Sequence, residues 1–217
     1  MDAADLRDHL LREGISRRVV EAMMSVPRDR FVPPGMRVRA WEDHAMSIGH
    51  GQTISQPTVV ALMTQAAAVG PGDHVLDVGT GSGYQAAVLA ATGARVHSIE
   101  RLPQLADQAR ATLAALSCDV DVTCGDGSAG LPGLAPFDAI VVAAATPTVP
   151  PALVEQLRAP GEGRPGGRLV IPIGEPSAWL GGQELVLLER VAEGLARRKL
   201  LDVVFVPLVW DPGRPGA

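Results

Sequence analysis

The pattern of apolar and polar positions changes twice along the first 70 residues. In residues 1–26, interpreted as two helices, Ile15, Val19 and Met23 form a stripe at helical spacing that stops before Pro27. Residues 27–56 hold no sustained period and contain several prolines and glycines, so we predict a long connection with little regular structure, a type of segment that often carries function. A further helix is expected from Pro57 to about Val69.

Beyond Pro71 short apolar runs alternate with helical patterns. We expect strands at residues 74–78, 94–99, 120–124, 137–143 and 168–173, and helices at 83–91, 102–116 and 151–157. This alternation predicts an α/β fold with a doubly wound, mainly parallel sheet. Two more strands are expected at 184–190 and 203–209, and the short polar segment between them favours an antiparallel pair. The expected fold is thus a seven-stranded Rossmann-like sheet with antiparallel C-terminal strands and an N-terminal helical extension.

Composition and charge narrow the classes of partner. The net charge is −5 and no block of Lys or Arg is present, so we expect neither nucleic acid nor a membrane as a partner. No apolar run approaches the ~20 residues needed to span a bilayer, and acidic residues in the first 20 positions argue against a signal peptide. The cytoplasm is therefore the expected location. The five histidines lack ligand spacing, so no metal is expected.

The most specific local motif lies where the first strand of the alternating region ends. Three glycines at alternate positions follow an acidic residue and precede a helix, and such a loop can bring a nucleotide close to the backbone. A dinucleotide fingerprint would need its third glycine at position 84, which is Tyr84, so the spacing favours motif I of S-adenosylmethionine-dependent methyltransferases. The candidate cofactor residues in this motif are Asp77, Gly79, Thr80, Gly81 and Gly83.

Two further acidic positions follow the next two expected strands. Glu100 ends the second strand, where a carboxylate can accept hydrogen bonds from a ribose diol, although a solvated acid paired with Arg101 is the alternative. Gly125 and Asp126 follow the third strand, where the acid can accept a hydrogen bond from an adenine amino group, although a simple Asp-Gly turn is the alternative. No P-loop lysine is present, which fits a cofactor without phosphate.

The polar segment before this motif is the candidate acceptor site. Thr53 and Ser55 flank Ile54, so in an extended backbone the two hydroxyls would point the same way. The alternative is a loop in which Ser55 lies near the N-cap of the next helix.

Gly51–Pro57 (Gly-Gln-Thr-Ile-Ser-Gln-Pro) resembles the signature of the protein-L-isoaspartate O-methyltransferases. Other short motifs follow in that family's order from about residue 15 to 208: Val26–Pro33, Asp77–Ala86, Ser98–Arg101, Gly125–Gly127, Phe137–Ala139, Pro150–Leu153, Gly166–Pro172 and Phe205–Leu208. Departures include Ala143–Pro147, Ser128 and an apparent insertion within Pro160–Pro165, none of which removes a candidate site residue.

The resemblance implies an enzyme that uses S-adenosylmethionine to methylate L-isoaspartyl carboxylates in damaged proteins and peptides. It assigns Ser55 as the active-site residue, with Thr53 and Ile54 beside it, and Val206 and Pro207 as walls of the peptide groove. Residues 1–56 would form the helices and the substrate-side loop, and 57–217 the cofactor-binding domain, in one compact and monomeric unit. The alternatives are a methyltransferase for a small molecule and a catalytically silent cofactor-binding module.

Overall fold

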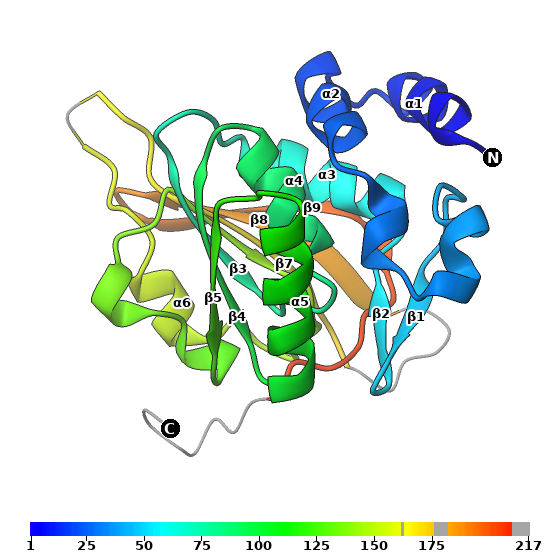
Figure 1. The fold of residues 1–217 in the computed structure, drawn as a ribbon. Coiled ribbons are helices and arrows are strands. Elements are labelled where there is room, and N and C mark those ends of the chain that lie inside the picture. Colours follow the sequence, from blue (N-terminus) through cyan, green and yellow to red (C-terminus); the bar gives the residue numbers. More distant parts are fainter. Residues whose placement is uncertain (162, 176–181, 210–217) are drawn as a thin grey trace.

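A seven-stranded sheet forms the centre of the protein, and a computed structural model describes residues 1–161, 163–175 and 182–209 (Figure 1). The sheet has the order β5-β4-β3-β6-β7-β8-β9. The strands are β3 His74–Val78, β4 Arg95–Glu100, β5 Val120–Cys124, β6 Ala139–Val142, β7 Arg168–Ile173, β8 Gln183–Val191 and β9 Gly194–Val203. The predicted α/β fold with its mainly parallel sheet is confirmed.

The five strands β3 to β7 are parallel, and β3 lies at the point where the strand order reverses. The chain continues from β3 to β4 and β5 on one side and returns to β6 on the other. Asp77 of β3 is thus opposite Ser98 of β4 and Val141 of β6. In such sheets a crevice opens at the carboxyl ends of the strands where the order reverses, and this is the usual place for a ligand.

The C-terminal strands are antiparallel as predicted, but the second one was placed wrongly. β9 begins at Gly194, directly after a tight turn from β8, whereas the sequence pattern indicated a strand at 203–209. All residues of β9 before Leu200 are exposed, and Arg197 and Lys199 pair with Glu184 across the hairpin. An edge strand tolerates charge and even gains from it, because charge blocks pairing with other chains. The apolar pattern of the sequence therefore did not indicate β9.

The connection 27–56 is also more regular than predicted. It contains two short 3₁₀ helices, η1 Arg28–Phe31 and η2 Pro34–Arg39, and a hairpin of β1 Met46–Gly49 with β2 Gln52–Ile54. These elements are too short to produce a detectable hydrophobic period. The hairpin places residues 52–55 beside the main sheet.

Helices cover both faces of the sheet and support the N-terminal extension (Figure 1). The α-helices are α1 Ala3–Arg12, α2 Arg17–Ser25, α3 Pro57–Ala67, α4 Tyr84–Ala91, α5 Pro103–Ala115 and α6 Pro151–Glu155, with two more 3₁₀ helices at η3 Gly127–Ala129 and η4 Pro132–Leu134. Along β3 the faces alternate: Val75 packs with residues of α3 and α4, and Leu76 packs with Leu153 of α6. Helix α2 contacts α4, and its Val20 and Met23 share one buried cluster with residues of α4 and α5, which joins the extension to the sheet domain.

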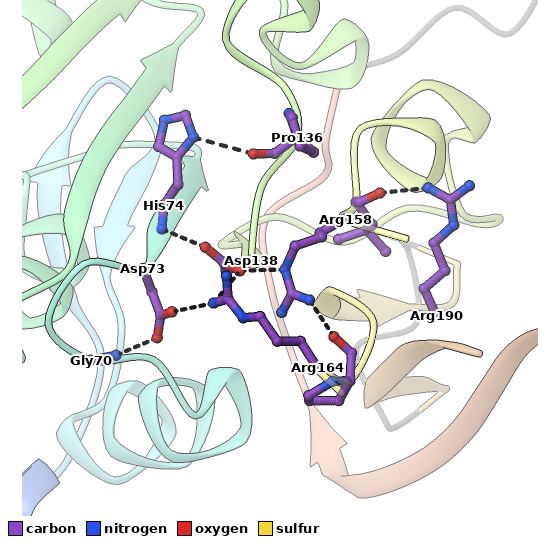
Figure 2. A network of polar contacts seen from close by, with 10 residues as sticks. Gly70, Asp73, His74, Pro136, Asp138, Arg158, Arg164 and Arg190 are labelled. Carbon is purple, nitrogen blue, oxygen red and sulfur yellow. Dashed lines mark hydrogen bonds and ion pairs between the residues drawn. The ribbon is translucent and has the colours of Figure 1, made fainter. Parts of the chain in front are cut away.

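A polar network closes the sheet at the amino ends of β3 and β6 (Figure 2). Asp138, just before β6, accepts hydrogen bonds from the His74 backbone N–H and from Arg158 Nε. Arg164 lies 3.5 Å from both Asp138 and Asp73. These contacts hold the segment after α6 at the end of the strands remote from the crevice. Among the described residues no helix has the length and apolar character needed to cross a membrane.

Candidate functional site

A cavity of about 330 Å³ opens at the carboxyl ends of β3, β4 and β6. It is lined by the hairpin residues 52–55, the loop and helix start after β3, the end of β4 and the segment 206–209. Gly127, Ala143 and Ala144 complete the wall. The cavity therefore brings together the two regions predicted as the separate donor and acceptor sites.

The glycine loop forms one wall, with Gly79, Thr80 and Gly81 at its surface. Gly79, Gly81 and Gly83 have φ values of +89°, +52° and +91°, a backbone conformation that L side chains rarely adopt. Gly83 does not line the cavity but precedes the first residue of α4. The loop thus turns sharply at its glycines and aims the positive end of α4 at the crevice.

Glu100 lies in the cavity wall with only 7% of its surface exposed. Its Oε2 accepts a hydrogen bond of 2.8 Å from the Gly81 N–H, and its Oε1 accepts one of 3.0 Å from the Leu102 N–H. A carboxylate has about four acceptor positions, so both oxygens keep the capacity to bind a diol. The backbone amides fix the carboxylate in place, as the predicted ribose site requires.

Asp77 is fully buried and does not line the cavity. Its Oδ2 accepts a hydrogen bond of 2.7 Å from Ser98 Oγ, and Ser98 in turn contacts the hydroxyl of Thr80. Burial raises the pKa of Asp77 to about 7. The hydrogen bond from Ser98 opposes this increase, and the negative charge of Glu100 adds to it. Asp77 therefore supports the loop from behind, through Ser98 and Thr80.

In the segment after β5, Gly127 lines the cavity, whereas Gly125 and Asp126 do not. Oδ1 of Asp126 accepts hydrogen bonds from the backbone and the hydroxyl of Ser128, at 2.9 and 2.8 Å. A Cβ at Gly127 would come within 2.6 Å of Val78 Cγ1, so only glycine fits there. The turn that was the alternative for Asp126 is thus present, and the adenine role stays a prediction for its other oxygen.

The acceptor wall contains each residue predicted for it: Thr53, Ile54, Ser55, Val206 and Pro207. Ile54 ends β2 and is buried, while Ser55 lies one residue beyond the strand and is half-buried. The N-cap of α3 is Gln56, so Ser55 lies next to the N-cap, as the alternative stated, but does not occupy the capping position itself. The segment 206–208 is tied to the sheet by hydrogen bonds with the backbone of Ala145, at 2.8 and 2.7 Å.

Tyr84 and Arg28 were not predicted as site residues. Tyr84 lines the cavity and is almost wholly buried, but in the sequence it only marked a departure from the dinucleotide fingerprint. Arg28 is fully buried, and its Nη2 donates a hydrogen bond of 2.7 Å to the Ser55 carbonyl. The available signal in the sequence was that Arg28 lies within the Val26–Pro33 motif. Its burial was not predicted, because arginine is seldom fully buried.

The chemistry of this arrangement combines carboxylates, backbone amides and hydroxyls around one cavity. Within the described ranges, no three His, Cys, Asp or Glu side chains gather as a group that could hold a metal ion. The wall of the cavity suits a ligand with hydroxyl groups on the Glu100 side and one with a carboxylate on the Ser55 side. Such a pair of neighbouring ligands is typical of group transfer.

Comparison with known proteins identifies the family. The model of the family "Protein-L-isoaspartate(D-aspartate) O-methyltransferase (PCMT)" matches residues 1–212. A protein-L-isoaspartate O-methyltransferase of Synechococcus sp. (strain JA-2-3B'a(2-13)) is 49% identical over 209 residues, which are 94% of this chain and 83% of the relative. Protein-L-isoaspartate O-methyltransferase 2 of Marinobacter nauticus is 47% identical, with 99% and 97% of the two chains covered.

Solved structures agree with this assignment. A protein-L-isoaspartate O-methyltransferase structure superposes with a TM-score of 0.81 at 27% identity, over 95% of this chain and 65% of the other. A Plasmodium falciparum structure described as a putative member, in complex with S-adenosyl-L-homocysteine, gives a TM-score of 0.80 at 25% identity, over 96% and 99% of the two chains. The chain thus belongs to the protein-L-isoaspartate(D-aspartate) O-methyltransferase family.

Proposed function

We propose that this protein transfers a methyl group from S-adenosylmethionine to the free carboxylate of L-isoaspartyl residues in damaged proteins and peptides. The observation that carries the proposal is the single cavity that joins the Gly79–Gly81 loop and Glu100 to Ser55. Family membership over residues 1–212 supports the same reaction. The cytoplasm as location and a monomer as assembly stay predictions.

The residues on the donor side fit S-adenosylmethionine. Glu100 offers a buried carboxylate for the ribose hydroxyls, and the glycine loop leaves the backbone open to close approach. Neither feature needs a phosphate, in keeping with the absence of a P-loop lysine. When bound, the cofactor would supply a methyl group on a cationic sulfur: a carboxylate oxygen can attack the methyl carbon in line, and the sulfur leaves as a neutral thioether.

The acceptor side requires positioning more than proton transfer. A carboxylate with a pKa of ~4 is already ionised near neutral pH, so the reaction needs no strong general base. We assign Ser55 the donation of a hydrogen bond that aims one carboxylate oxygen, with Thr53 beside it. Ile54, Val206 and Pro207 line the same wall and exclude water from the peptide. Orientation of this kind can supply several kcal/mol.

The product is an isoaspartyl methyl ester, which determines the assay. The following backbone amide nitrogen attacks the ester carbonyl, a succinimide forms and methanol leaves; hydrolysis of the succinimide then returns part of the chain to normal aspartate. Incubation of an isoaspartyl peptide with S-adenosylmethionine should therefore release methanol, whereas the same peptide with normal aspartate should not. Cofactor binding without methylation of the isoaspartyl peptide would contradict the substrate assignment.

A further inference from the structure

Arg28 is a buried cation to which the sequence alone assigns no role. It begins η1, and none of its surface is exposed. Its Nε donates to the Ala40 carbonyl at 2.8 Å, and its Nη2 donates to the Ser55 carbonyl at 2.7 Å. The guanidinium carbon lies 4.7 Å from the centre of the Tyr84 ring. Arg28 therefore joins three segments that are far apart in the sequence.

No carboxylate of the described residues forms an ion pair with this guanidinium, and its Nη1 has no hydrogen-bond partner among them. The nearby Asp43 carboxylate is instead engaged by Gln56, Thr58 and His9. Burial lowers the pKa of Arg28, while Tyr84 and Asp43 oppose this decrease. A buried charge without a counter-ion is destabilising, so a fold seldom retains one without compensation.

Two of the three groups that Arg28 contacts, Ser55 and Tyr84, belong to the cavity wall. Ser55 and Tyr84 line the cavity together, and the Tyr84 hydroxyl has no hydrogen-bond partner in the described part of the chain. Burial raises the pKa of Tyr84 to about 12, so this hydroxyl stays neutral. The positive charge thus lies directly behind the wall at which the proposed substrate presents a carboxylate. Charges of opposite sign attract more strongly where protein rather than bulk water lies between them.

We propose that Arg28 is a positioning residue that holds the Ser55 peptide and Tyr84 in place, and that the substrate carboxylate supplies its missing counter-charge. Arg28 would then select an anionic acceptor over a neutral one of the same shape. This inference rests on the proposed function, since it requires an isoaspartyl carboxylate beside Ser55.

The test compares two peptides that differ only in charge. One carries isoaspartate, and the other carries isoasparagine, in which a carboxamide replaces the free carboxylate. Their dissociation constants are measured by calorimetry on protein saturated with S-adenosylhomocysteine. For Arg28→Gln we expect the isoaspartyl peptide to bind roughly tenfold more weakly, with little change for the isoasparaginyl peptide or for S-adenosylhomocysteine. Arg28→Lys keeps the charge and should lose less affinity.

The matched control is Arg30→Gln, which removes an exposed positive charge from the same short helix. It should change neither peptide's affinity by more than about twofold, because solvent screens an exposed charge. If the role of Arg28 is purely structural, Arg28→Gln should lower the affinity for both peptides equally, and this result would overturn the proposal. Unchanged binding of both peptides would also overturn it.

The unmodified protein provides a further test if neither Arg28 variant folds. The proposal requires that it bind the isoaspartyl peptide at least about tenfold more tightly than the isoasparaginyl one, and equal affinities would refute it. Failure of the proposed function has a different signature. In that case the unmodified protein binds S-adenosylhomocysteine but neither methylates nor binds the isoaspartyl peptide.

Discussion

The two sides of the cavity bury ionisable groups of opposite type, acids on one side and a base on the other. On the donor side Asp77 and Glu100 are 0% and 7% exposed, and both are carboxylic acids. On the acceptor side the buried group that carries a charge is Arg28, at 0% exposed, since the buried Tyr84 hydroxyl stays neutral. The proposed donor is a cation and the proposed acceptor is an anion, so each ligand would meet an environment of the complementary sign. The difference indicates that electrostatics, as well as shape, separates the two binding regions.

The two sides also differ in how the fold builds them. Donor residues follow consecutive parallel strands, and the register alone brings them together, as with Asp77 opposite Ser98. Acceptor residues come from η1, the end of β2, the start of α4 and the segment 206–208, which only tertiary packing unites. If the two sides function independently, a substitution on one side should leave the function of the other side unchanged.

The largest effect is expected at the acceptor side, from Ser55→Ala. Loss of the orienting hydrogen bond should lower kcat for an isoaspartyl peptide by roughly 100-fold or more, with the affinity for S-adenosylhomocysteine unchanged. Methanol release and calorimetry measure the two quantities. Ser47→Ala, an exposed serine of the same hairpin, is the control and should retain activity. Equal losses of turnover and cofactor affinity would show that the two sides are not separable.

The next effect concerns stability on the donor side, through Asp77. Its pKa of about 7 lies above the ordinary value of 3.8, so between these values the folded state holds a proton that the unfolded state has lost. The contribution of Asp77 to stability must therefore fall as the pH rises, by about 1 kcal/mol per pH unit in this window. Relative to the unmodified protein, Asp77→Asn should gain stability from pH 5 to 6.5 in urea unfolding.

Asp119→Asn removes an exposed carboxylate and serves as the control for this pH dependence. Its stability difference from the unmodified protein should stay constant over the same range. A constant difference for Asp77→Asn as well would mean that Asp77 is ionised in the folded protein.

A smaller effect, a loss of cofactor affinity, is expected from Glu100→Gln. The variant removes the charge that would accept hydrogen bonds from a ribose diol, and such bonds contribute about 1.5–3 kcal/mol. Affinity for S-adenosylhomocysteine should fall by roughly tenfold or more. Asp107→Asn, an exposed acid on α5, should leave the affinity unaltered. Unchanged binding in Glu100→Gln would assign Glu100 to the structure of the Gly81 loop alone.

The smallest effect should come from Asp126. Asp126 also accepts a hydrogen bond from Ser128 within a turn, so the test has to separate this turn from the adenine contact. Asp126→Ala should lower the affinity for S-adenosylhomocysteine by about fivefold, consistent with a hydrogen bond of about 1 kcal/mol. It should not lower the affinity for S-inosylhomocysteine, which lacks the 6-amino group. Ser128→Ala disturbs the turn only, and equal effects of the two variants would exclude the adenine role.

Much of the donor side was predictable because its signals are local. A strand end, alternate glycines and an acidic residue after each strand occupy short stretches, and parallel pairing then sets their neighbours. Asp77 shows the limit of such reasoning, since its side chain points behind the loop and supports Thr80 through Ser98. The strand predicted at 203–209 shows another, because an exposed edge strand carries no apolar alternation.

The sequence by itself determined the α/β class, the parallel order of elements, the glycine loop and the family signature around Ser55. These features depend on periodicity and on residue types within a few positions of one another. The tertiary structure decided which side chains share the cavity, where β9 runs, and that Arg28 lies buried behind Ser55 and Tyr84. Such facts depend on contacts between segments tens of residues apart, and no local pattern encodes their geometry.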